Sequence, residues 1–202
     1  MLAAQLRREA LGQSTKVLDL CSGSGILAIV AAESGAGQVT AVDISRRAVF
    51  NTWLNAKLNG VSVEVLRGDL LAAVDGRKFD VIVSNPPYLL SASEHLPRRG
   101  SLQALDAGPT GRILIDRICA GVEDYLAPGG VLLLVHSSLC DDQRTIGLFE
   151  ARGYEVSVPL RHTGPLGKRM RARAPMLRAR GLLQNGEIED IVVIRAKRPA
   201  AA

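Results

Sequence analysis

A polar, proline-bearing segment follows one of the most apolar runs of the chain. The run Phe79 to Ser84 ends in Asn85, Pro86, Pro87 and Tyr88. The Asn85 side-chain carbonyl and the Pro86 main-chain carbonyl can each accept one N–H of a planar NH₂ group, which draws its nitrogen toward tetrahedral geometry. Tyr88 can stack on that flat group, and the prolines fix the backbone in advance. These residues predict a site that aligns a poor nitrogen nucleophile for an in-line displacement. A simple proline turn after a strand is the alternative.

A glycine-bearing turn follows the first apolar run, Lys16 to Leu20. Cys21, Gly23 and Gly25 lie in this turn, and the glycines let the backbone approach a ligand at the amino end of the next helix. The turn therefore predicts a nucleotide-like cofactor. Because it also matches the dinucleotide fingerprint G-x-G-x-x-A, a dehydrogenase stays open at this point. Cys21 itself is better explained as a small space-filling residue than as a catalytic thiol.

Three carboxylates narrow the choice of cofactor. Asp19 precedes the glycines, where it would repel a pyrophosphate but attract the cationic aminopropyl end of S-adenosylmethionine. Asp43 closes the second apolar run and can accept a ribose diol, and Asp69 is placed to accept the exocyclic amine of adenine. Ile44 and Leu70, which follow these last two acids, are expected at the same cofactor. Together with the glycine turn, the acids predict a pocket for S-adenosylmethionine, although each acid alone could be an ordinary turn residue. With residues 85–88, this pocket predicts methyl transfer to nitrogen.

Seven short β-type runs alternate with longer helix-like segments, and this alternation is typical of a parallel sheet covered by helices on both faces. The runs are Lys16 to Leu20, Gln38 to Val42, Ser62 to Leu66, Phe79 to Ser84, Gly130 to His136, Tyr154 to Pro159 and Ile188 to Ala196. The sequence thus predicts an α/β fold in which the acids and glycines meet at the carboxyl edge of the sheet.

Two helices are marked by their ends. One is expected from Gly25 to Ser34, between a glycine turn and the glycines that follow. The other should begin after Ser45, which can cap it, and end at Gly60. Its Val49, Trp53 and Ala56 share one face.

Two connections, Ser84 to Gly111 and Arg161 to Gly186, are longer than usual in compact domains, which favours a functional role. The second holds seven cations and no acid through Gly181, in a chain with net charge +5. A solvated mobile loop is one interpretation, and contact with RNA is the other. Base stacking is not expected, because no aromatic residue is interleaved. The cations are Arg161, Lys168, Arg169, Arg171, Arg173, Arg178 and Arg180.

The whole chain suits one globular domain, residues 1–202, because 202 residues with 47% hydrophobic content can bury a core. Its longest apolar runs fall short of the roughly 20 residues that span a bilayer, and its first residues lack a signal-peptide pattern. We therefore expect a cytoplasmic protein without a membrane contact. Cys21, Cys119 and Cys140 lie far apart and form no metal-binding pattern, so no metal is expected.

The segments VLDLCSGSGILAI, AVDIS, GDLL and SNPPY, in this order and spacing, resemble the HemK/PrmC family of class I methyltransferases. The resemblance extends over Lys16 to Val158. It implies a Rossmann-like class I methyltransferase fold with a seven-stranded, mostly parallel sheet, helices on both faces and an antiparallel last strand. It also implies methylation of the side-chain glutamine amide in the GGQ motif of peptide-chain release factors. Family roles carry over to Asp19, Gly23, Gly25, Asp43 and Asp69 for the cofactor, and to residues 85–88 for the target nitrogen.

Departures from the family also shape the expectations. Cys21 stands where the first glycine of the motif usually lies. The chain begins almost at its first strand and lacks the helical amino-terminal domain of the bacterial members, so we expect either an incomplete cofactor lid or a start site upstream of Met1. It resembles the short eukaryotic and archaeal branch, whose members pair with a small zinc-binding activator.

Two alternatives remain open from the sequence. An adenine amino group presents nearly the same NH₂ geometry as a glutamine amide, so methylation of RNA or DNA is one of them. Duplex DNA would need a flipped base and a separate recognition domain, for which 202 residues leave little room. The other is an inactive, cofactor-binding partner subunit.

Overall fold

A computed structural model describes residues 1–95, 105–183 and 186–200. Its centre is a seven-stranded sheet in the order β3-β2-β1-β4-β5-β7-β6. Strands β1 to β5 run parallel, whereas β7 pairs antiparallel with both β5 and β6. The strands are β1 (Lys16–Leu20), β2 (Gln38–Asp43), β3 (Glu64–Arg67), β4 (Phe79–Ser84), β5 (Leu126–Ser137), β6 (Glu155–Pro165) and β7 (Ile188–Lys197). The fold class predicted from the sequence, with its antiparallel last strand, is confirmed.

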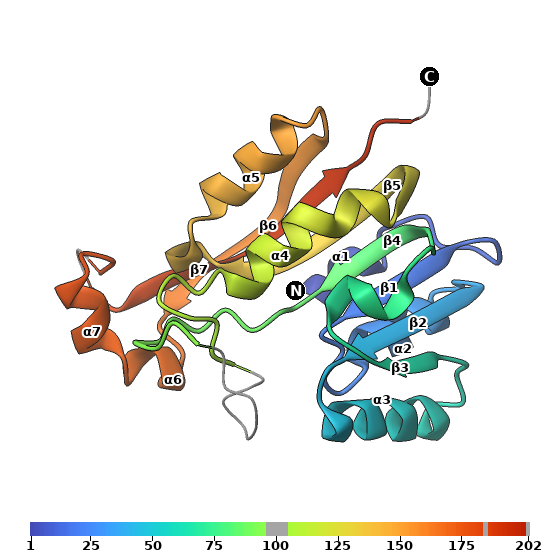
Figure 1. Cartoon of the computed structure of the whole chain (residues 1–202), viewed down its shortest axis with the longest axis horizontal. Helices are drawn as coiled ribbons and strands as arrows, with labels where there is room; N and C mark the ends of the chain where they lie inside the picture. Colours follow the sequence, from blue (N-terminus) through green and yellow to red (C-terminus); the bar gives the residue numbers. More distant parts are fainter. Residues whose placement is uncertain (96–104, 184–185, 201–202) are drawn as a thin grey trace.

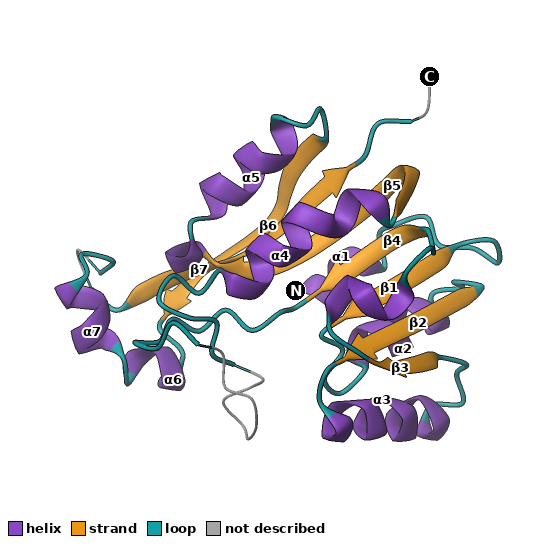
Figure 2. Ribbon diagram, in the orientation of Figure 1, coloured by secondary structure: helices purple, strands orange, loops and turns teal. Residues whose placement is uncertain are grey.

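Helices cover both faces of the sheet (Figures 1 and 2). The α-helices are α1 (Leu2–Leu6), α2 (Ile26–Glu33), α3 (Arg46–Leu58), α4 (Ile113–Gly121), α5 (Asp142–Glu150), α6 (Lys168–Arg171) and α7 (Ala174–Ala179). Short 3-10 turns occupy η1 (Leu70–Val74), η3 (Val122–Asp124) and η4 (Ser138–Cys140). No helix in the described part of the chain has the length and apolar character needed to cross a membrane.

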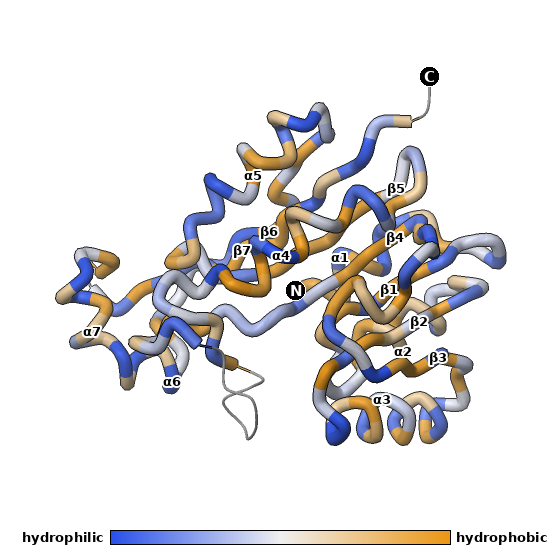
Figure 3. Tube along the Cα trace, viewed as in Figure 1, coloured by the Kyte–Doolittle hydropathy of each residue, from blue (hydrophilic) through white to orange (hydrophobic). Residues whose placement is uncertain are grey.

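The core consists of two apolar layers, one on each side of the sheet. Successive residues of β1 point to opposite layers, so Val17 packs with α1 and α2 while Leu18 packs with α4 and α5. Because both faces are buried, the central strands are apolar along most of their length, as Figure 3 shows for β4 and β5. Packing on both faces of the sheet therefore fixes the strand ends, where the predicted site residues lie.

The strand predictions were accurate for β1 and β4 and too short for β5, which begins at Leu126, and for β6. β1 and β4 have the predicted limits, whereas β6 continues to Pro165. The interpretation of Arg161 to Gly181 as a solvated mobile loop is not supported: the segment completes β6 and then forms α6 and α7, and Met170 and Leu177 are buried. The sequence also failed to indicate α1, whose leucines pack in the α2 layer.

The second predicted helix is confirmed with one difference. Ser45 caps α3 by accepting a hydrogen bond from the Ala48 N–H at 3.4 Å. Trp53, however, is 47% exposed and does not join the buried face with Ala56.

Candidate active site

The glycine turn after β1 adopts a backbone that most residues avoid. Cys21, Gly23 and Gly25 have φ angles of 60°, 56° and 81°. Gly25 is required for a second reason, because a Cβ atom there would lie 2.8 Å from the Thr52 methyl group. Cys21 occupies the left-handed region despite its side chain, which costs roughly 1 kcal/mol. The turn therefore brings its main chain close to α3 and to the start of α2.

Two polar side chains of α3 hold this turn. The Asn55 amide donates to the Ser24 carbonyl at 2.9 Å, and the Thr52 hydroxyl donates to the Gly23 carbonyl at 3.3 Å. Sequence reasoning missed both residues. Their spacing of three on the helix was the available signal, because it places them on one face beside Ala56.

Asp19 lies beneath the turn and is fully buried. Its Oδ2 accepts a hydrogen bond from the Ala28 N–H at 3.1 Å, whereas Oδ1 is buried without a partner among the described residues. Burial raises the pKa of this carboxyl to about 8; the Ala28 N–H opposes the shift and nearby Asp43 adds to it. A buried carboxyl with an unsatisfied oxygen suits a ligand that brings positive charge to the turn.

Asp43 ends β2 and links the turn to α3. Its Oδ2 accepts from the Gly23 N–H at 3.0 Å and its Oδ1 from the Ser45 N–H at 2.9 Å. Each oxygen keeps a lone pair for a further donor, such as a ribose hydroxyl. Ile44, the next residue, is 46% exposed and offers an apolar surface beside this carboxylate.

Asp69 lies after β3 and faces α4. One of its carboxylate oxygens, Oδ2, forms an ion pair with Arg117 at 2.9 Å, and both side chains are about half exposed. Leu70 follows with a φ of 52° and is buried. The other oxygen of Asp69 stays available for a donor such as an adenine amine. The structure does not bring Asp69 into hydrogen-bond contact with Asp19 or Asp43.

Residues 85–88, named the acceptor segment after the role predicted for them, start beside the glycine turn. Leu20 and Ser84 are partners in the β1–β4 register, and the Ser84 hydroxyl donates to the Leu20 carbonyl at 2.9 Å. Asn85 therefore emerges next to Cys21. Asn85 is exposed, whereas Pro86 is buried.

Residues 85–89 line a cleft of about 370 Å³. The same cleft is bordered by Leu105, by residues 167–170 at the start of α6, and by Glu189 of β7. The structure thus brings together two sequence features about eighty residues apart, the proline-bearing segment and part of the basic run. Burial, followed by the charge of Glu189, raises the pKa of Tyr88, so its phenol stays protonated at neutral pH.

Residues behind the acceptor segment fix its backbone, and the sequence did not reveal them. The Cys140 thiol donates to the Tyr88 carbonyl at 3.2 Å. Gly111 has a φ of 70°, and a Cβ there would lie 2.6 Å from the same carbonyl. The buried Arg112 donates to the Asp141 carbonyl at 2.7 Å and also to the Cys140 carbonyl, which holds the thiol in place.

The expectation of a free basic surface for RNA is not supported. Five of the seven cations bind protein groups: Arg161 pairs with Asp142 and Asp190, Arg171 and Arg178 pair with Glu187, Arg173 pairs with Asp106, and Arg180 donates to the Pro109 carbonyl. Charges that are neutralised within the fold contribute little to phosphate binding.

A family model described as the methyltransferase small domain matches residues 1–101, half of the chain. The chain belongs to this methyltransferase family. The dehydrogenase alternative left open by the glycine pattern is therefore wrong, and the resemblance seen in the sequence is confirmed.

Relatives and solved structures agree with this family. The methyltransferase is 36% identical over 154 residues to a Methanocaldococcus jannaschii protein provisionally named protein N5-glutamine methyltransferase, covering 76% of this chain and 78% of that one. It is 41% identical over 133 residues to the release factor glutamine methyltransferase of Shewanella oneidensis, covering 62% of this chain and 46% of that one. The match thus spans about half of the Shewanella enzyme. The E. cuniculi Mtq2-Trm112 complex, described as methylating eRF1, has the same fold, with a TM-score of 0.67 at 20% identity over 98% of this chain and 92% of that one.

Proposed function

We propose that this methyltransferase transfers a methyl group from S-adenosylmethionine to the side-chain amide of glutamine in the GGQ motif of a peptide-chain release factor. The observation that carries the proposal is the position of residues 85–88, which begin beside the turn after β1 and line a cleft. The names of the two relatives support the choice of a glutamine amide. The cytoplasm, where release factors act, is the proposed compartment.

The residues around the turn fit the proposed cofactor. Asp19 supplies buried negative charge for the aminopropyl end. Gly23 leaves room for close approach of a ligand, whereas Gly25 allows the turn to pack closely against Thr52. Asp43 would accept the ribose hydroxyls. The free oxygen of Asp69 would accept the adenine amine, with Ile44 and Leu70 providing apolar contact. S-adenosylmethionine supplies an electrophilic methyl group on a sulfonium.

The chain's own contribution to the transfer is positioning. The Asn85 carbonyl and the Pro86 main-chain carbonyl accept the two N–H groups of the target amide, which localises the nitrogen lone pair and stabilises the positive charge that develops. Tyr88 covers the flat face of the amide and excludes water. Pro87 restricts the backbone, and Gly111 and Cys140 hold the Tyr88 carbonyl from behind.

The proposal is tested by incubating the purified protein and labelled S-adenosylmethionine with a release factor, with its GGQ-to-GGA variant and with ribosomal RNA. Label on the release factor that disappears in the GGA variant is the expected result. Label on RNA alone would instead establish the adenine alternative, and the absence of label on all three would favour the inactive subunit.

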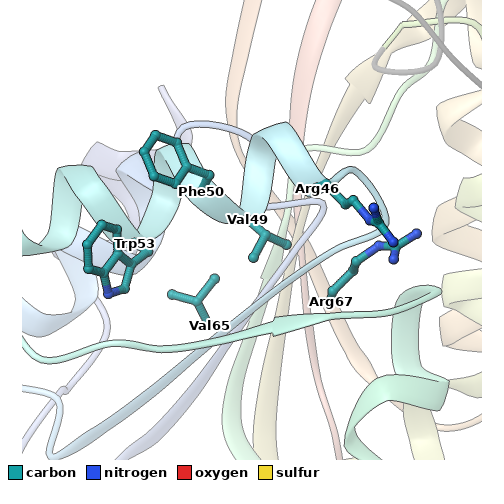
Figure 4. Close-up of a pocket in the computed structure, with 6 residues that line it drawn as sticks. All are labelled: Arg46, Val49, Phe50, Trp53, Val65 and Arg67. Atoms are coloured by element: carbon teal, nitrogen blue, oxygen red, sulfur yellow. The ribbon is translucent and has the colours of Figure 1, made fainter.

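We also propose that a small activator subunit covers the outer face of α3. Phe50, Trp53 and Leu58 are 57%, 47% and 75% exposed. Phe50 and Trp53 line a groove of about 290 Å³ against the edge strand β3, with Arg46 and Arg67 together at one end (Figure 4). Apolar surface beside two cations fits a partner with an apolar face and a nearby carboxylate. The partner protein in the E. cuniculi complex gives the precedent.

Co-expression with a Trm112-type protein tests this docking site. The wild-type protein and a Leu182→Ser control, which also changes an exposed leucine but outside the groove, should co-purify with the partner. Trp53→Glu should not. Unchanged co-purification of Trp53→Glu would contradict the assignment of the groove.

A further inference from the structure

A carboxylate lines the same cleft as the acceptor segment. Glu189, near the start of β7, is half-buried and borders the cleft together with residues 85–88. After burial, the charge of Glu189 is the next cause that raises the pKa of Tyr88, so the carboxylate lies near this phenol. The proposed transfer step does not use Glu189, because Asn85 and Pro86 hold the target amide. The carboxylate is therefore available for another part of the substrate.

Protein donors hold the Glu189 carboxylate in one place without exhausting it. Its Oε2 accepts from the Ser137 hydroxyl at 2.6 Å, and its Oε1 accepts from the Gly167 N–H at 3.3 Å. Each oxygen of a carboxylate can accept more than one hydrogen bond, so both keep a lone pair. Within the described ranges Glu189 forms no ion pair, not even with Lys168 or Arg169, which line the same cleft. The cleft thus contains a positioned acceptor with spare capacity.

The proposed substrate presents donors of one kind at this position. The two glycines that precede the target glutamine have no polar side chain, so their polar groups are the main-chain N–H and C=O. An ionised carboxylate only accepts hydrogen bonds, so it can pair with an N–H and not with a C=O. A main-chain N–H that enters a cleft without a partner costs free energy, and a charged acceptor forms a stronger hydrogen bond with it than a neutral one does. Glycine also lets the main chain approach the carboxylate closely.

We propose that Glu189 binds the substrate directly, and that its carboxylate accepts a hydrogen bond from a main-chain N–H of the Gly-Gly-Gln segment. The inference rests on the proposed glutamine methyltransferase function. Glu189 holds the backbone of the segment while Asn85 and Pro86 hold the side-chain amide, so the two contacts together fix how the glutamine enters the site. Loss of Glu189 should therefore weaken use of the protein substrate and leave the affinity for the cofactor nearly unchanged.

Removal of single N–H groups from the substrate tests the proposal. Three semisynthetic release factors each carry one ester oxygen in place of the main-chain N–H of the first glycine, the second glycine or the glutamine. With labelled S-adenosylmethionine and the wild-type enzyme, the ester at the contacted position should lower kcat/KM about tenfold or more, as expected for a hydrogen bond to a charged group. With Glu189→Ala the same ester should change kcat/KM by less than about twofold, because the N–H no longer has its acceptor.

The comparison separates substrate binding from a purely structural role. Glu189→Ala also removes the contacts with Ser137 and Gly167, but that loss acts equally on the unmodified and the ester substrates. Glu189→Gln keeps the shape and one neutral acceptor, and it serves where the alanine variant does not fold; its ester effect should be smaller than that of the wild type. The matched control Glu155→Ala removes an exposed acid of β6 outside the cleft and should keep the wild-type ester effect.

The outcomes also separate this inference from the proposed function. Ester effects that are the same in the wild type and in the Glu189 variants at all three positions would overturn the inference and leave glutamine methylation standing. Failure of the wild-type enzyme to label the unmodified release factor would overturn both.

Discussion

The buried carboxyl of Asp19 leads to a quantitative prediction about protons. Its pKa is about 8 in the structure described here, because the side chain is fully buried and Oδ1 has no partner among the described residues. A cationic ligand end near Oδ1 favours the ionised carboxylate and lowers the pKa. Binding of the cofactor should therefore release the proton of Asp19.

The size of the release follows from that pKa. A carboxyl with a pKa of about 8 is protonated in about nine of ten molecules at pH 7, so binding should release about 0.9 proton there, about 0.5 at pH 8 and about 0.1 at pH 9. The affinity for the cofactor should consequently rise with pH up to about pH 8 and level off above it.

Calorimetric titration with S-adenosylhomocysteine measures the release directly, because this ligand has the same aminopropyl end and cannot react. At pH 7 the observed enthalpy should vary with the ionisation enthalpy of the buffer, with a slope of about 0.9 proton. Asp19→Asn should abolish the slope. A wild-type slope near zero, or an unchanged slope in Asp19→Asn, would refute the role of this carboxyl.

The same carboxyl sets the pH dependence of stability without ligand. Its folded pKa of about 8 lies above the ordinary value of 3.8, so the folded state retains a proton that the unfolded state has lost. The free energy that this carboxyl adds to folding is fully present below about pH 4. It is lost as pH rises to about 8, by on the order of 1 kcal/mol per pH unit. Asp19→Asn should flatten this dependence in denaturant titrations.

Three further substitutions test the backbone and the cleft. Cys21→Val should lower the free energy of unfolding by about 2 kcal/mol, because a β-branched residue tolerates a positive φ poorly. Cys21→Gly should not lower it. Equal losses for the two variants in denaturant titrations would contradict a left-handed backbone at Cys21. Gly111→Ala should reduce kcat about tenfold or more by displacing the Tyr88 carbonyl but leave cofactor affinity within about twofold, and a parallel loss of affinity would argue for general misfolding. Arg173→Ala should lower the free energy of unfolding by about 2 kcal/mol, against about 0.5 kcal/mol for the exposed Arg178→Ala. Similar losses for the two variants in thermal unfolding would contradict the role of the Arg173 contacts with the Leu90 carbonyl and Asp106.

Features encoded in local spacing were predictable from the sequence. Buried parallel strands are continuous apolar runs, so Lys16–Leu20 and Phe79–Ser84 were located with the correct limits. The glycine turn and the acids follow such strands directly, so their position at one edge of the sheet could be predicted from the topology of a parallel sheet.

Features that depend on distant partners were missed. The end of β6 carries Arg161, whose charge suggested a loop, but Asp190 of the neighbouring strand neutralises it. The helix α6 has four residues and its only buried one is Met170, so it lacks an amphipathic pattern. Gly111 and Cys140 support the acceptor segment only through tertiary contacts. Part of the Ser84 to Gly111 connection, for which the sequence favoured a functional role, lies outside the described residues.

Asn85 is proposed to hold the target amide for methyl transfer. The most direct test is single-turnover transfer of labelled methyl to a GGQ-containing release factor, with cofactor affinity measured on the same samples. Asn85→Ala should lower transfer by at least about a hundredfold while cofactor affinity stays nearly unchanged. Transfer by Asn85→Ala at the wild-type rate would contradict the account.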